Sequence, residues 1–189
     1  MTEGELPGVG VSLVGLLGVF VLVAANGYFV ATEFALVAVR RSQLKLWLAA
    51  GKPGAGSAMK AVNQLLAGVH IAAMAEALTF GMTQGVAPAT FLDVISKCAG
   101  TSWMLENRAP HIVDGDYTPL SSVDIWPKDL GIVLDIARSA HFSAPLAAAA
   151  LQQFLAAQGS GLGQEDDAAV AKIYARNAGL TLPGTRVND

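Results

Sequence analysis

A lysine and two amides are the side chains in this sequence whose types and spacing best suit chemistry. Lys60, Asn63 and Gln64 are spaced i, i+3 and i+4 in a segment of helical periodicity, so they share one face of the predicted helix. An ammonium and two amides near a helix start can hold a carboxylate or a hydroxyl. From spacing alone a second interpretation stays open, in which these residues form a solvated helix start.

Other groups that commonly carry chemistry show no such pattern. His70, His111 and His141 are isolated and lack metal-ligand spacing, so we predict no metal site. Cys98 is the single cysteine, which excludes an internal disulfide, and its apolar neighbours predict a buried, inert thiol. The net charge of −3, with no dense basic face, excludes a nucleic-acid partner.

The lysine and the amides belong to the longest predicted helix. Apolar residues at helical spacing predict a helix from Gly54 to about Gln84, and Pro88 and Pro145 are suited to the first turns of two later helices. Further helical segments are predicted over residues 88–99, 128–139, 145–158 and 165–177. The last of them begins with acidic residues, which complement the helix dipole. No alternating strand pattern is present in the sequence.

The first fifty residues differ from the rest in hydrophobicity. Leu6 to Thr32 is an uncharged apolar run, which as a helix would be about 40 Å long, against a hydrocarbon core of about 30 Å. Acidic residues precede it and basic residues follow it, so the positive-inside rule places the following domain in the cytoplasm. A cleaved signal peptide ending near Val23-Ala24-Ala25 is the main alternative. We therefore predict a transmembrane helix and basic juxtamembrane segment over 1–53, and a helical domain over 54–189.

Part of this N-terminal region resembles a family of ion transporters. The stretch from Asn26 to Ser42 is similar to the first transmembrane helix of the CorC/cyclin M magnesium and cobalt transport proteins, and the resemblance implies that Thr32 lies near an ion. A single helix cannot enclose an ion path, so transport does not follow from it.

The helical region carries a second resemblance. The pattern Gly-x-Gly-x-x-x-Lys-x-x-Asn, from Gly54 to Asn63, resembles the catalytic signature of the β-hydroxyacid dehydrogenases, which include 3-hydroxyisobutyrate, tartronate semialdehyde and threonate dehydrogenases. Similar sequence continues to about residue 180, through 100–108, 114–119 and 123–131. The similarity is greatest to the threonate branch.

This resemblance implies roles for particular residues. Lys60 would be the general acid/base, and Gly56, Asn63 and Gln64 would bind the substrate, a small hydroxy acid. Lys128 and Asp129 would lie at the cofactor, which is NAD or NADP. Pro127 departs from the family pattern, and it leaves the orientation of Lys128 unaffected only if its helix begins near residues 124–126.

The resemblance also sets the expected fold. It implies an all-α domain of the 6-phosphogluconate dehydrogenase C-terminal type, here after one transmembrane helix. No Gly-x-Gly-x-x-Gly motif follows a predicted strand, and Gly159-Ser160-Gly161-Leu162-Gly163 has the wrong spacing and context, so we predict no Rossmann domain.

Taken together, these features predict the catalytic and substrate-binding half of an NAD(P)-dependent 3-hydroxyacid dehydrogenase, inactive alone. Its partner would be a second copy or a separate Rossmann-containing subunit, and its location the membrane, or the cytoplasm if the N-terminal segment is an artefact. Two alternatives remain: a membrane-anchored helical dimerisation module, and a fusion relic without function.

Overall fold

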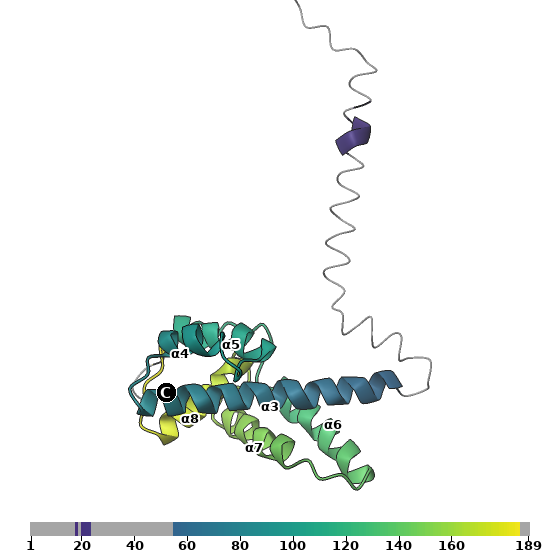
Figure 1. Cartoon of the computed structure of the whole chain (residues 1–189). Coiled ribbons are helices and arrows are strands. Elements are labelled where there is room, and N and C mark those ends of the chain that lie inside the picture. The colour runs from purple at the N-terminus through teal and green to yellow at the C-terminus, as the bar shows by residue number, and fades with distance from the viewer. Residues whose placement is uncertain (1–17, 19, 24–54, 186–189) are drawn as a thin grey trace, which may run out of the picture. The chain divides into compact units, whose positions relative to one another are not determined.

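The computed structural model describes residues 18, 20–23 and 55–185 (Figure 1). The chain divides into two compact units, Met1–Gly56 and Ser57–Asp189. In the first unit the described residues, 18, 20–23, 55 and 56, are helical. The rest of the predicted membrane segment, and the stretch similar to the CorC/cyclin M proteins, lie outside the described residues. The division into domains 1–53 and 54–189 stays a prediction.

The second unit is built around α3, Ala55–Thr83, a helix of 29 residues. The second half of α3 supplies the core, with Ile71, Met74, Ala75 and Leu78 almost fully buried. The helix predicted from the sequence, Gly54 to Gln84, agrees with the observed helix to within one residue at each end.

The first half of α3 is far more exposed than the second. Met59, Val62 and Leu66 are each about half exposed. Among the described residues one helical segment, Gly56–Thr83, is long and apolar enough to cross a membrane. Because a core helix of a globular domain passes the same test, and the second half of α3 is buried, this is weak evidence for a membrane span.

Five further α-helices and one 3₁₀ helix pack with α3. They are α4 (Pro88–Ile95), α5 (Trp103–Asp114), α6 (Ile125–Ser139), α7 (Pro145–Gly159), η1 (Asp167–Val170) and α8 (Ala171–Asn177). In Figure 1, α4 and α5 lie on one side of α3, and α6 and α7 form a helical hairpin on the other. Among the described residues the β structure is limited to one isolated bridge, between Ser122 and Asp166.

Prolines and caps explain where several helices begin and end. Pro88 and Pro145 occupy the first turns of α4 and α7, as predicted, where a missing amide donor costs nothing. Helix α5, which was not among the predicted helices, begins at an N-cap, Ser102, whose hydroxyl accepts from the Leu105 amide at 3.0 Å. It ends at Gly115, which has a left-handed φ of 67°.

The start of α6 and the end of α4 decide two predictions, one about Pro127 and one about Cys98. Helix α6 begins at Ile125, so Pro127 lies in its first turn and does not kink it. Cys98 is exposed, which corrects the prediction of a buried thiol. The reason is that α4 ends at Ile95, and Cys98 lies in the turn that follows rather than on a buried helix face.

Candidate functional site

Three of the predicted site residues lie on one face of α3, within its first three turns. Lys60 and Asn63 are exposed, and Gln64 is half-buried. Gly56 precedes them by one turn, and a Cβ atom at Gly56 would meet nothing within 4 Å. No hydrogen bond or ion pair of the Lys60 ammonium is seen among the described residues. The lysine is therefore available to a ligand.

The structure joins this face to α6 through a chain of hydrogen bonds. The Asn63 amide nitrogen donates to Gln64 Oε1 at 3.0 Å, and Gln64 Nε2 donates to Asp129 Oδ2 at 2.6 Å. The other carboxylate oxygen of Asp129 lies 3.5 Å from the Lys128 ammonium. Both polar ends of Gln64 are thus used within the protein, whereas the Asn63 amide oxygen has no such bond in the described part of the chain. We call these four residues, Asn63, Gln64, Lys128 and Asp129, the α3–α6 polar line.

The members of the polar line differ in exposure. The side chain of Asp129 is 13% exposed and that of Lys128 is 70% exposed. Asp129 is therefore held against α3, while Lys128 reaches into solvent beside it. The exposed Lys128 ammonium can reach an anionic group such as a phosphate, while the Asp129 carboxylate beside it offsets part of its charge. The pair is too exposed to stabilise the fold much.

A glycine on α3 allows α6 to lie close enough for this contact. A Cβ atom at Gly68 would lie 3.0 Å from side-chain atoms of both Trp126 and Leu130. Gly68 is one turn after Gln64 on the same face of α3, and Asp129 lies between Trp126 and Leu130 in sequence on α6. The close approach at Gly68 therefore brings Asp129 within hydrogen-bonding distance of Gln64.

A second polar cluster is fully buried. Arg108 Nε donates to Asp167 Oδ1 at 2.6 Å, and Trp126 Nε1 donates to Asp167 Oδ2 at 2.9 Å. Asp166 lies beside them, with one carboxylate oxygen 3.9 Å from Arg108 Nε. Both aspartates are 0% exposed. We call these four residues, Arg108, Trp126, Asp166 and Asp167, the buried acidic cluster.

Each aspartate of this cluster has a distinct structural role. Asp166 caps η1 by accepting from the Ala168 amide at 3.0 Å, and its other oxygen accepts from the Leu120 amide at 2.9 Å. Burial raises the pKa of Asp167 to about 6, and the neighbouring Arg108 guanidinium opposes that rise. The cluster connects α5, α6 and η1, and its members are too buried to meet a substrate.

The sequence pattern predicts a helix start at the acidic run from residue 165 and indicates no buried partner for it. The buried acidic cluster is not visible in the pattern, because its ion pair joins residues 59 positions apart. A signal was present in the α5 segment, where Met104, Leu105, Arg108 and Ile112 are spaced as one buried helix face. An arginine on such a face needs a buried carboxylate partner.

The histidines lie apart from one another. His111 Nδ1 is hydrogen-bonded to the Asp116 carbonyl oxygen at 2.8 Å. His141 is exposed and follows α6 with a left-handed φ of 53°. His70 lines a cavity beside α3. Among the described residues no three His, Cys, Asp or Glu side chains gather as metal ligands.

Comparisons with known proteins place this arrangement in context. Residues 54–174 match the family model described as "NAD-binding of NADP-dependent 3-hydroxyisobutyrate dehydrogenase". L-threonate dehydrogenase of Cupriavidus necator is 60% identical over 131 residues, which are 69% of this chain and 43% of the relative. L-threonate dehydrogenase of Escherichia coli K12 is 47% identical over 164 residues, covering 87% of this chain and 53% of the relative.

A solved structure gives the same result. The crystal structure of 3-hydroxyisobutyrate dehydrogenase from Salmonella typhimurium is 54% identical, with a TM-score of 0.63, and covers 65% of this chain and 43% of that one. The chain therefore spans about half the length of the relatives that it matches. The matches support the resemblance to hydroxyacid dehydrogenases and give no support to the resemblance to CorC/cyclin M proteins.

The family match confirms one prediction and corrects another. NAD or NADP is confirmed as the cofactor of the family. The predicted fold class, an all-α domain of the 6-phosphogluconate dehydrogenase C-terminal type with no Rossmann domain, is contradicted, because the matching model is an NAD-binding one. The prediction failed because it looked for nucleotide binding only in a Gly-x-Gly-x-x-Gly turn after a strand. The matched residues that the structure describes are instead mostly helical.

Proposed function

Because this chain belongs to the NAD-binding family of NADP-dependent 3-hydroxyisobutyrate dehydrogenase, we propose that it takes part in the NAD(P)-dependent oxidation of a small hydroxy acid of the threonate type. The observation that carries the proposal is the exposed face of α3. There Lys60, whose ammonium has no hydrogen bond or ion pair among the described residues, lies one turn from Asn63, and the Asn63 amide is fixed by the α3–α6 polar line. That is the arrangement a hydroxyl group needs if it is to be held and deprotonated at once.

We assign the proton transfer to Lys60. During oxidation its amine takes the proton of the substrate hydroxyl, and during reduction its ammonium returns that proton to the carbonyl oxygen. Oxidation also needs a hydride acceptor for the carbon that bears the hydroxyl, which is the chemistry that NAD(P) would supply when bound. Lys60 lies on a rigid helix, and its ammonium has no competing ion pair in the described part of the chain, so it is free to meet the substrate oxygen.

We assign substrate positioning to Asn63. Its amide oxygen can accept from a substrate hydroxyl, and its amide nitrogen has a second hydrogen beyond the one donated to Gln64. Gly56, one turn before Lys60, leaves open space beside that face of α3. Gln64, the third residue predicted to bind substrate, holds Asn63 in place through its own hydrogen bonds.

The residues at the end of the polar line fit an anionic cofactor. Lys128 presents an exposed ammonium beside Asp129, and the pair lies on the first two turns of α6, next to α3. We assign Lys128 to the phosphate groups of NAD(P), because an ammonium on a flexible stem can follow a phosphate. Asp129 then keeps Lys128 close to Asn63.

The test compares Lys60→Met with Lys97→Met in the full chain. Lys97 is also an exposed lysine, paired with Asp93, and it lies away from the polar line, so it is a matched control. We expect wild-type and both variants to bind NADH or NADPH in calorimetry. L-threonate oxidation, followed by the absorbance of the reduced cofactor, should fall by about 10²-fold or more in Lys60→Met alone.

Two outcomes would contradict the proposal. Equal turnover in Lys60→Met and wild-type would remove Lys60 from the chemistry. If the chain binds neither NAD(H) nor NADP(H) at millimolar concentration and shows no turnover, the dehydrogenase function is excluded. The second candidate function, described next, would then be favoured.

The second candidate is a helical dimerisation module. It is favoured by Met59, Val62 and Leu66, which are exposed along α3 by 47%, 54% and 48%. Apolar residues at this spacing can pack against a second copy of the helix. Light scattering after size exclusion, on wild-type and Val62→Glu, tests it: a dimer that the variant converts to monomer supports this function.

A further inference from the structure

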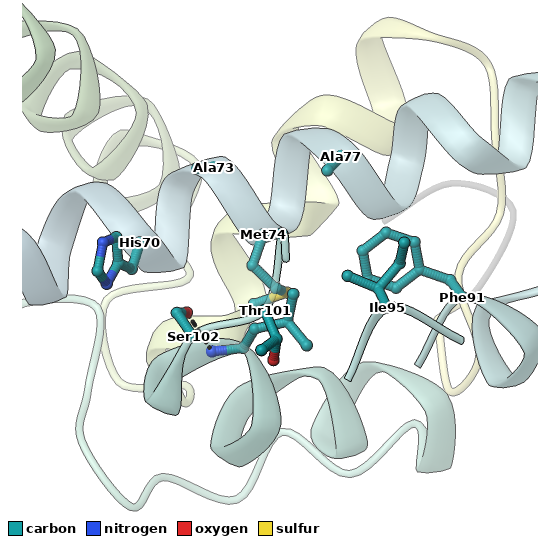
Figure 2. A pocket seen from close by; sticks show the side chains of 10 residues that line it. His70, Ala73, Met74, Ala77, Phe91, Ile95, Thr101 and Ser102 are labelled. Carbon is teal, nitrogen blue, oxygen red and sulfur yellow. Dashed lines mark hydrogen bonds between the residues drawn. The ribbon is translucent and has the colours of Figure 1, made fainter. Parts of the chain in front are cut away.

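A cavity of about 340 Å³ lies between α3, the turn after α4 and the start of α5 (Figure 2). Its lining includes no member of the α3–α6 polar line: its first lining residue on α3, His70, is six residues after Gln64, or about 9 Å along the helix axis, and ten residues after Lys60, or about 15 Å. The lining residues are His70, Ala73, Met74, Ala77, Phe91, Ile95, Gly100, Thr101, Ser102 and Leu105. None of them is Asp, Glu, Lys or Arg.

The cavity is polar at one end and apolar at the other. Figure 2 shows His70 and Ser102 toward one end, and Phe91 and Ile95 at the opposite end, with Met74 between them. Ligand sites commonly combine an apolar wall with a few polar groups, and this volume falls within their usual range of about 300–1,000 Å³.

The two polar groups have unused hydrogen-bonding capacity. Ser102 Oγ accepts from the Leu105 amide at 3.0 Å, which leaves the hydroxyl hydrogen to donate. No hydrogen bond of the His70 ring is seen among the described residues, and a neutral imidazole offers one donor and one acceptor. The Thr101 hydroxyl is already bonded to the Glu106 carboxylate at 2.9 Å. The available donor and acceptor groups are therefore at one end only.

We propose that this cavity is a binding site for a small neutral molecule with one hydroxyl or carbonyl group and an apolar body, such as an aromatic ring. The ligand's polar group would meet His70 and Ser102, and its ring would lie against Met74, Phe91 and Ile95. A charged ligand is excluded, because the lining has no charged residue to offset the lost hydration. The Glu106 carboxylate, which accepts from the hydroxyl of the lining residue Thr101, repels anions further. A hydroxy acid, with its carboxylate, belongs at Lys60 and not here.

Three ligands of similar shape test the chemistry: benzyl alcohol, toluene and sodium benzoate. We expect the full chain to bind benzyl alcohol in an NMR titration, with shifts at residues that line the cavity. Toluene lacks the hydroxyl and should bind about 5- to 10-fold more weakly, the loss that one hydrogen bond produces. Benzoate should show no binding at this site.

Two variants test the location. Ala77→Phe should fill the cavity and abolish benzyl alcohol binding, since Ala77 lines the cavity and is exposed on α3, so that a larger side chain need not displace the core. Ala149→Phe, at an exposed alanine of α7 outside the cavity, is the matched control and should bind as wild-type does. Thermal unfolding of both variants shows whether they fold.

A third variant tests the polar end of the cavity. His70→Leu keeps the side-chain volume and removes the polar group, so it should reduce the preference for benzyl alcohol over toluene.

The proposal is overturned if benzyl alcohol does not bind, if Ala77→Phe binds it as well as wild-type, or if benzoate binds as tightly as benzyl alcohol. Equal affinity for toluene and benzyl alcohol would also overturn it, because the polar end would then have no role. None of these outcomes depends on Lys60. The site can therefore fail while the proposed dehydrogenase function holds, and the reverse is also true.

Discussion

The α3–α6 polar line and the buried acidic cluster both join distant segments through a carboxylate, but the two carboxylates differ in their exposure to solvent. Asp129 accepts from Gln64 at the edge of solvent, beside a lysine that is 70% exposed. Asp167 accepts from Arg108 and Trp126 with no exposure at all. A buried carboxylate that loses its partner has no water to replace it, whereas an exposed one does. Stability should therefore depend on the cluster, and ligand binding on the line.

The largest expected effect comes from breaking the cluster. Arg108→Met removes the guanidinium and leaves two buried aspartates without a counter-charge. We expect the free energy of unfolding to fall by about 3–5 kcal/mol, measured by urea denaturation. The matched control is Arg138→Met, which removes the exposed partner of Asp135 and should leave stability nearly unchanged. Similar losses in both variants would show that burial does not distinguish the two arginines.

The raised pKa of Asp167 predicts that the stability contributed by the buried acidic cluster depends on pH. Burial, as the largest effect, raises its folded pKa to about 6 from 3.8, so the folded state holds this proton more tightly than the unfolded state. The stabilisation from the protonated form is therefore complete below about pH 4 and is lost as the pH rises through 6. Relative to Asp167→Asn, which does not titrate here, wild-type should lose stability between these pH values. A stability difference that stays constant from pH 4 to 7 would contradict the raised pKa.

Gly68 links the two regions, and its substitution should have the next largest effect. A Cβ atom there meets Trp126 and Leu130 at 3.0 Å, and Trp126 cannot easily yield, because it is bonded to Asp167 and stacks on Phe154 at 5.5 Å. We expect Gly68→Ala to cost about 1–3 kcal/mol in urea denaturation, despite the better helix propensity of alanine.

The control for Gly68 lies on the neighbouring helix. A Cβ atom at Gly131 of α6 meets nothing within 4 Å, so Gly131→Ala should gain up to about 1 kcal/mol from helix propensity. If Gly68→Ala were also stabilising, the close approach of α3 and α6 would not depend on the glycine.

Local features of this domain could be predicted from the sequence, and long-range ones could not. The ends of α3 and the starts of α4 and α7 followed from apolar spacing and from Pro88 and Pro145, because these signals act over a few residues. That Lys60, Asn63 and Gln64 share a face followed from helix geometry alone. The buried ion pair of Arg108 was missed, since its partner is 59 residues away.

The candidate site shows the same division. Lys128 and Asp129 were named only through a family resemblance, and nothing in the spacing indicated that Asp129 lies 2.6 Å from Gln64, 65 residues earlier. That contact depends on how closely α3 and α6 approach at Gly68, which is a property of packing. The prediction of no Rossmann domain was wrong, because it depended on the absence of one loop motif, whereas an NAD-binding family model matches residues 54–174 without that motif.

The smallest and most specific effect is expected from exchanging the donor and the acceptor of the hydrogen bond between Gln64 and Asp129. Gln64→Glu places two carboxylates in contact, while adding Asp129→Asn restores a donor, because the new amide at position 129 can donate to the new carboxylate at position 64. We expect Gln64→Glu alone to cost about 1 kcal/mol, since the pair is only partly buried, and the double variant to recover most of it. Under the proposed function, KM for L-threonate should rise in the single variant and recover in the double one, because the carboxylate at position 64 can again accept from Asn63. Recovery of stability without recovery of KM would mean that the polar line holds the two helices together but does not position Asn63 for the substrate.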